Sequence, residues 1–260
     1  MQYFFSYDET IADFNQYHNS KESKSSLQFE HGFGIGDAIL FSSYIKNICL
    51  LNPTIKYYHY SKNLFEFNKT LYSDISNITI LETPKKSIKK ISLCFEDVVN
   101  HYTWRTLDYK RNQEKEFLIY EDIIRKFGRD YIIIHERSKD NCDREMKLIN
   151  RQLINNPKNL PIINLDFNWL KKNKINRPHN LLDLRIVLEQ ASHLHLYEGS
   201  IANFADSICT KAISKCIHLY CKPHLFNETL VHNKIIGYLE QGLWFSKNWQ
   251  VFKTENGLLL

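Results

Sequence analysis

Apolar positions along the chain follow two alternating patterns. Short apolar, β-branched and aromatic runs predict strands, which begin at residue 27 and continue at 54–60, 77–81, 90–95, 131–134, 160–165, 193–197 and 216–220. Helical stretches between them are predicted over about 37–50, 114–127, 181–191 and 201–212. In the third of these helices, Leu181, Leu184 and Leu188 recur at spacings that put them on one face. Strands separated by helices are typical of a doubly wound parallel sheet, so we expect an α/β fold.

The predicted strands form two series, which indicates two Rossmann-like domains facing a cleft. Residues 1–26 end in a polar run without apolar periodicity and are expected to be a lead-in. The first domain is predicted over 27–127, where Gly128 ends a helix, and the second domain over 128–260. An aromatic tail over 243–252 is expected to pack on the sheets as a closing helix or strand.

The composition is that of a folded protein with a substantial core. The 260 residues include 43% hydrophobic and 13% aromatic side chains, which is atypical of disordered chains. The net charge of +5 is compatible with an anionic small substrate, with peripheral association with a membrane surface, or with a solvated lysine-rich surface. We expect no nucleic-acid partner.

The cysteines and the N-terminal residues bear on the compartment. Six cysteines are scattered without the paired spacing of a zinc site, so we expect free thiols in a reducing environment. Asp8 and Glu9 lie where a signal peptide needs a long apolar core, and no apolar run reaches the roughly 20 residues of a membrane span. The expected location is the cytoplasm.

A glycine-rich turn follows the first predicted strand. Its sequence is E-H-G-F-G-I-G over 30–36, in which Gly34 and Gly36 allow a phosphate or sugar to approach the backbone closely. The dinucleotide pattern G-x-G-x-x-G fails, because Asp37 occupies its last glycine position and the second strand lacks a ribose-binding acid near Tyr60. The turn resembles the E-x-G-x-G-x-G turn of S-adenosylmethionine-dependent methyltransferases, which would also need that acid. A turn used only for packing is a third interpretation.

The start of the following helix resembles that of bacterial heptosyltransferases. The run G-D-A-I-L over 36–40, followed by S-S-Y-I over 42–45, is similar to their G-D-x-apolar-apolar…P-x-apolar segment, with Ser43 and Tyr44 in place of a small residue and proline. The resemblance implies that Asp37 lies in the cleft and acts as general base on an acceptor hydroxyl. Helix capping alone also explains an acid at this position.

A second resemblance lies at the end of the strand predicted over 131–134. The run H-E-R-S-K-D over 135–140 is similar to the H-x-R-x-x-D segment of GDP-fucose-dependent fucosyltransferases, which have the same two-domain architecture. The resemblance implies that Arg137 holds the donor diphosphate, with His135 beside it and Asp140 orienting it. Guanidinium suits this role, because it binds phosphate bidentately and neutralises charge on a leaving nucleotide. The other interpretation is a surface arginine paired with a neighbouring acid.

A third segment follows the strand predicted over 193–197. Glu198, Gly199, Ser200 and Ile201 resemble the late donor-binding region shared by both families, where a strand ends in small or hydroxyl residues at a helix start. The resemblance implies phosphate contacts from Ser200 and the amide of Ile201, and sugar or ribose contacts from Glu198. Ordinary helix capping by Ser200 is the other interpretation.

Together these resemblances imply a GT-B-type glycosyltransferase of polysaccharide biosynthesis. It would move a sugar from a nucleotide-sugar donor, held mainly by the second domain, to a glycan or glycolipid acceptor. We expect inversion at the sugar, with no metal and no separate cofactor. His193 and His195 are expected to be packed or surface histidines, since no third ligand lies at useful spacing. The alternatives are methyl transfer and a non-catalytic nucleotide- or sugar-binding module.

Overall fold

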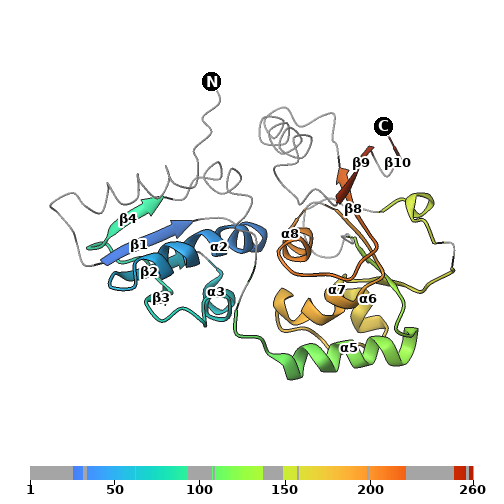
Figure 1. Ribbon diagram of the computed structural model, residues 1–260, viewed down its shortest axis with the longest axis horizontal. Helices are drawn as coiled ribbons and strands as arrows, with labels where there is room; N and C mark the ends of the chain where they lie inside the picture. Colours follow the sequence, from blue (N-terminus) through green and yellow to red (C-terminus); the bar gives the residue numbers. More distant parts are fainter. Residues whose placement is uncertain are drawn as a thin grey trace. The chain divides into compact units, whose positions relative to one another are not determined.

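The chain divides into two compact units, Met1–Lys110 and Arg111–Leu260. The computed structural model describes residues 26–31, 34–61, 63–92, 107, 109–136, 149–156, 158–197, 199–220, 249–255 and 258–259. Figure 1 shows the described strands and helices of each unit.

The first unit contains a four-stranded parallel sheet. Its strands are β1 (Ser26–His31), β2 (Lys56–Ser61), β3 (Ile78–Leu81) and β4 (Lys89–Ser92), in the order β3-β2-β1-β4. Helix α2 (Ile35–Leu51) connects β1 to β2, and α3 (Phe65–Leu71) connects β2 to β3. This order is that of a Rossmann-type half with one further strand on the other side of β1.

Helix α2 covers this sheet with one face. Phe41, Ile45 and Cys49 recur every four residues along the helix and are fully buried, whereas Leu50 is exposed. On the sheet itself, the rings of Phe29 and Tyr57 stack with their centroids 5.4 Å apart. The core of the first unit therefore lies between β1, β2 and α2.

The second unit contains a six-stranded sheet. Its strands are β5 (Ile132–His135), β6 (Ile162–Asn164), β7 (His193–Tyr197), β8 (Ser214–Tyr220), β9 (Trp249–Glu255) and β10 (Leu258–Leu259), in the order β10-β9-β8-β7-β5-β6. Strands β5 to β9 are parallel and β10 is antiparallel to β9. The α/β prediction with two parallel sheets is confirmed, and part of the aromatic tail forms a strand.

A helix precedes these strands, and further helices and short helical turns lie between them in the sequence (Figure 1). They are α5 (Gln113–Phe127), the 3-10 turns η2 (Arg151–Leu153) and η3 (Leu181–Leu184), and the helices α6 (Phe167–Lys172), α7 (Arg185–Gln190) and α8 (Ser200–Asp206). The helix predicted over 181–191 is thus divided between η3 and α7, and the one predicted from 201 ends earlier, at Asp206.

The boundary between the units differs from the prediction. The sequence placed it after residue 127, at the glycine that ends a helix, and Gly128 does end α5 with a φ of 86°. However, α5 packs on α7 and η3, with Ile119 and Ile123 fully buried, and so it belongs to the second unit. A helix stop signal reports where a helix ends and carries no information about which sheet the helix covers.

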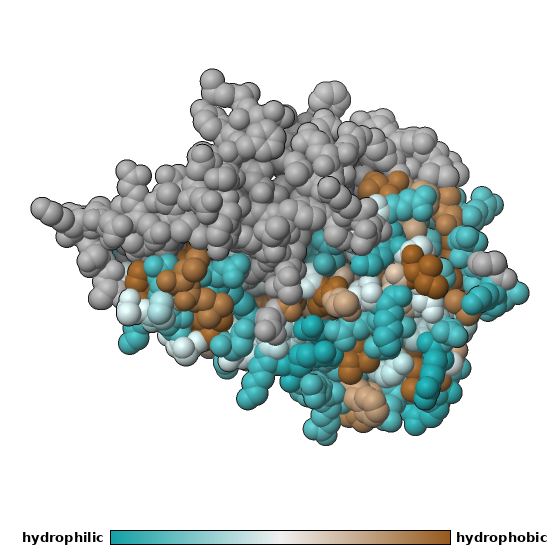
Figure 2. Space-filling view, in the orientation of Figure 1, coloured by the Kyte–Doolittle hydropathy of each residue, from teal (hydrophilic) through white to brown (hydrophobic). Residues whose placement is uncertain are grey.

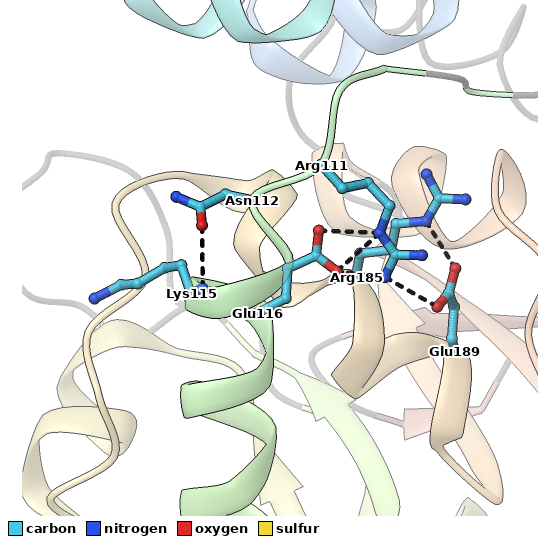
Figure 3. A network of polar contacts seen from close by, with 6 residues as sticks. All are labelled: Arg111, Asn112, Lys115, Glu116, Arg185 and Glu189. Atoms are coloured by element: carbon cyan, nitrogen blue, oxygen red, sulfur yellow. Dashed lines mark hydrogen bonds and ion pairs between the residues drawn. The ribbon is translucent and has the colours of Figure 1, made fainter.

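A polar network fixes the start of the second unit to its helices (Figure 3). The Arg111 guanidinium bonds to the Glu116 carboxylate through Nε at 3.1 Å, and it contacts Glu189 of α7 at 3.3 Å. Arg185 completes the network by donating to Glu189 at 2.7 Å. Burial raises the pKa of Glu116, and the adjacent Arg111 opposes that shift.

Candidate functional site

Each sheet has one point at which its strand order reverses direction along the chain. In parallel α/β sheets, ligands bind outside the carboxyl ends of the strands at such a point. In the first sheet the reversal separates β1 from β4, and in the second sheet it separates β5 from β7. The predicted site segments follow β1, β5 and β7, the strands at these two points.

At the first reversal, β1 leads through the glycine turn into α2. Gly34 is exposed just before the helix and accepts a hydrogen bond from the Ala38 amide at 3.0 Å, and Gly36 lies in the first turn. Asp37 is also in this turn, where a carboxylate is electrostatically favoured. The structure describes the backbone of Asp37 and not its side chain. Gly32 lies outside the described residues.

At the second reversal, two aromatic side chains meet at the ends of neighbouring strands. His135 ends β5 and Tyr197 ends β7, and their rings stack with centroids 5.0 Å apart and planes 10° apart. Sequence reasoning proposed His135 and did not consider Tyr197. An aromatic residue at the end of a buried strand reads as core, so nothing in the sequence distinguished it.

The segment after β7 is also at this edge of the sheet. Gly199 has a φ of 153°, which side-chain-bearing residues rarely adopt, and α8 begins at Ser200. Gly199 is the N-cap residue, so the interpretation in which Ser200 caps the helix is wrong. Ile201 is buried in the first turn. Glu198 lies outside the described residues.

Arg137 and Asp140 also lie outside the described residues, which end at Glu136 before resuming at Ile149. Glu136 is the last described residue before them in the sequence, and it is only 7% exposed. Its carboxylate accepts from the Ile149 amide at 3.0 Å, from Arg151 Nη2 at 2.8 Å and from Asn164 Nδ2 at 3.1 Å.

The Glu136 contacts hold three chain segments together at the ends of β5 and β6. The Asn164 side chain takes part twice more, because its Oδ1 accepts from the amides of Glu136 at 3.3 Å and Asp166 at 3.1 Å. The Glu136 carboxylate thus forms an ion pair with the Arg151 guanidinium. Sequence reasoning missed Arg151 and Asn164, which lie 15 and 28 residues away from Glu136.

Two buried histidines lie on the neighbouring strands. His195 Nδ1 and His218 Nε2 are 3.2 Å apart, and each residue is 2% exposed. Burial lowers the pKa of His195 to about 4 and that of His218 to about 3. His193 instead bonds Ser214 Oγ through Nδ1 at 2.7 Å. Within the described ranges, no group of three histidine, cysteine, aspartate or glutamate side chains has the arrangement of a metal site.

Comparison with known proteins gives a likeness of fold. No protein-family model matches the chain, and no curated protein matches it. The chain is similar to the crystal structure of the glycosyl transferase family 9 protein from Veillonella parvula DSM 2008. The match has a TM-score of 0.50 and 10% sequence identity, and it covers 88% of this chain and 86% of that one. At this identity the match shows the fold alone: α/β with two parallel sheets, similar to a GT-B glycosyltransferase.

The helices of the described ranges were compared with the length and apolar character that a membrane span needs. None of them is both long enough and apolar enough to cross a bilayer.

Proposed function

We propose that this chain is a glycosyltransferase that moves a sugar from a nucleotide-sugar donor to a glycan or glycolipid acceptor. One observation carries the proposal. The glycine turn and the two predicted donor-binding segments follow the strands at the order reversals of two parallel sheets, within a fold similar to that of a glycosyl transferase family 9 protein.

The second unit is proposed to hold the donor. Arg137 would clamp the diphosphate and neutralise the charge that develops on the leaving nucleotide, and Asp140 would orient its guanidinium. The stacked rings of His135 and the buried Tyr197 fix the end of β5, just before Arg137 in the sequence, against the end of β7. Glu136 supports this region from beneath by joining the end of β5 to residues 149–151.

The segment after β7 is proposed to complete the donor site. The absence of a side chain at Gly199 lets a phosphate approach the backbone, and the hydroxyl of Ser200 with the amide of Ile201 would donate to it. Glu198 would accept hydrogen bonds from sugar or ribose hydroxyls.

The first unit is proposed to present the acceptor near Gly34 and Gly36. Asp37 would remove the proton of the acceptor hydroxyl as its oxygen forms a bond to the anomeric carbon. The bond from that carbon to the diphosphate oxygen breaks, and the nucleoside diphosphate leaves with the bonding electrons. Attack from the opposite side inverts the sugar and needs no metal.

Release of nucleoside diphosphate from a panel of nucleotide sugars, with and without candidate acceptors, tests this function. We expect release with one donor, and Arg137→Ala should lower kcat/KM by about a hundredfold or more, because a charged contact to the leaving group is lost. Arg137→Lys should recover part of the activity, since it restores the charge without the bidentate geometry. Equal activity of the wild type and Arg137→Ala would remove Arg137 from the site.

A further inference from the structure

The outer side of α6 and the adjoining end of α5 form a basic and aromatic surface, which we call the α6 face. Its exposed side chains are Lys126, Phe167, Lys171, Lys172 and Lys174. Residues 167–177 contain four basic side chains and no acidic one.

The α6 face has a defined geometry. Leu170 is 1% exposed and anchors α6 to the unit, whereas Phe167, 51% exposed, and Lys171 lie one helical turn apart on the outer side. Trp169 contacts Phe127 of α5, with ring centroids 5.6 Å apart. The position of α6 is therefore set by the packing of Trp169 and Leu170.

Lys126 joins the two helix ends. Its ammonium donates to the backbone carbonyls of Asn173 and, at 3.2 Å, of Lys174, just beyond α6. This contact brings a cation of α5 next to the lysines that follow α6. In Figure 2, apolar patches interrupt the polar surface over the part of the second unit that contains α5.

The nearby acidic side chains are engaged elsewhere. Asp122 contacts Arg125 and accepts from the backbone and side chain of Asn176 at 2.8 and 2.7 Å. Asp166 accepts from two amides at the start of α6. Within the part of the chain that the structure describes, Lys171, Lys172 and Lys174 make no ion pair, so their charge faces solvent.

We propose that the α6 face docks on an anionic lipid bilayer. Lysines beside an exposed aromatic ring match such a surface, because the ammonium groups meet lipid phosphates while the ring enters the headgroup region. Nucleic acid is a poorer match, since phosphate recognition there favours arginine and stacking of several rings. Docking holds the enzyme on the surface that carries a glycolipid, and it depends on none of the catalytic assignments.

Sedimentation of the full chain with phosphatidylcholine vesicles, with and without about one third phosphatidylglycerol, tests the proposal. We expect binding to the anionic vesicles that weakens with salt, and none to pure phosphatidylcholine. The triple variant Lys171→Gln, Lys172→Gln, Lys174→Gln should bind the anionic vesicles at least about tenfold more weakly. Phe167→Ser should weaken binding by about threefold to tenfold.

A matched variant separates this surface from the net charge of the protein. Lys56→Gln, Lys86→Gln, Lys158→Gln removes the same charge from exposed positions elsewhere and should bind vesicles within about twofold of the wild type. Melting curves confirm that each variant is folded. The proposal is overturned if the wild type ignores anionic vesicles, if both triple variants lose binding equally, or if the α6 face binds single-stranded RNA and no vesicle.

Discussion

The candidate binding edges of the two units are the carboxyl end of β1 in the first unit and the carboxyl ends of β5 and β7 in the second, and they differ in the chemical groups that they contain. In the first, β1 leads through glycines into α2, a helix of 17 residues with exposed Gly34 just before it. In the second, β7 leads through Gly199 into α8, which has only seven residues, beside the stacked rings of His135 and Tyr197. The first edge offers mainly backbone groups, and the second offers side chains held by a buried network.

This difference has consequences for how each edge responds to change. A backbone edge keeps its shape when one side chain is replaced, because the helix itself holds the amides in position. A side-chain edge depends on Glu136 and on the buried histidines, so it is sensitive to single substitutions and to protonation. We therefore expect substitutions in the first unit to change chemistry and those in the second to change stability as well.

The largest effect is expected from Asp37→Asn in the first unit. Loss of the general base should lower kcat by about a thousandfold while donor affinity stays within about twofold. Steady-state kinetics and donor titration of the same preparation measure both, with Asp130→Asn, an exposed position in the second unit, as control. Unchanged kcat would leave Asp37 as a residue that only favours the helix start.

Acid should weaken the second unit before the first. The folded pKa values of His195 and His218, about 4 and about 3, lie below the ordinary value of 6.5, so the unfolded chain binds more protons between these limits. Stability is fully present above about pH 6.5 and falls as the pH drops towards 4. The expected loss down to pH 4 is about 3 kcal/mol for each of the two histidines, since each unit of pKa shift corresponds to about 1.4 kcal/mol.

Hydrogen exchange followed separately for the two sheets measures this effect. Amides of β7 and β8 should lose protection as the pH falls from about 6.5 to about 4, after correction for the intrinsic exchange rate. His193 and Arg151 add positive charge close to His195 and oppose its protonation further. Replacement of His218 by Phe should flatten the dependence. Equal loss from both sheets would contradict the comparison.

Glu136→Gln should destabilise the second unit by about 2 kcal/mol. The substitution removes the charge of a buried acceptor that binds Arg151 and the Ile149 amide, and the half-exposed Arg151 limits the loss because it can turn to water. Denaturant unfolding measures the change, with Glu121→Gln on the exposed side of α5 as the control. A loss below about 0.5 kcal/mol would mean that the network does not hold this edge.

The smallest effects are expected at the glycines, and they should differ in kind. Gly199→Ala should cost about 1 kcal/mol, because φ is 153° there, although the added carbon meets Tyr197 only at 3.9 Å. Gly36→Ala lies in the regular backbone of α2 and should leave stability unchanged or slightly raised. Thermal unfolding of both variants compares them. A larger loss at Gly36 would reverse the assignment of strain to the second unit.

The strand pattern could be predicted because it is local. Each predicted run contains a strand or part of one, since apolar and β-branched side chains favour strands through contacts within a few residues. The short helices α3 and α6 were missed, because seven and six residues are too few to display a helical period.

The sequence could predict the candidate site only at the positions where a glycine-containing turn follows a strand. Glycines after a strand are visible in sequence, whereas the partnership of Glu136 with Arg151 and Asn164 arises when β5 and β6 pair. The pairing of His195 with His218 likewise depends on β7 and β8 being neighbours. Contacts between side chains that are far apart in the sequence and meet only because their strands are neighbours produce no local sequence pattern.

A thermal-shift screen of the full chain tests the central claim most directly. The ligands are GDP, UDP, ADP and CMP, their common sugar conjugates, and S-adenosylmethionine, since a ligand that binds only the folded state raises Tm. We expect one nucleoside diphosphate and its sugar conjugate to raise Tm, and Arg137→Ala to abolish that shift. A shift with S-adenosylmethionine alone would contradict glycosyl transfer and favour methyl transfer.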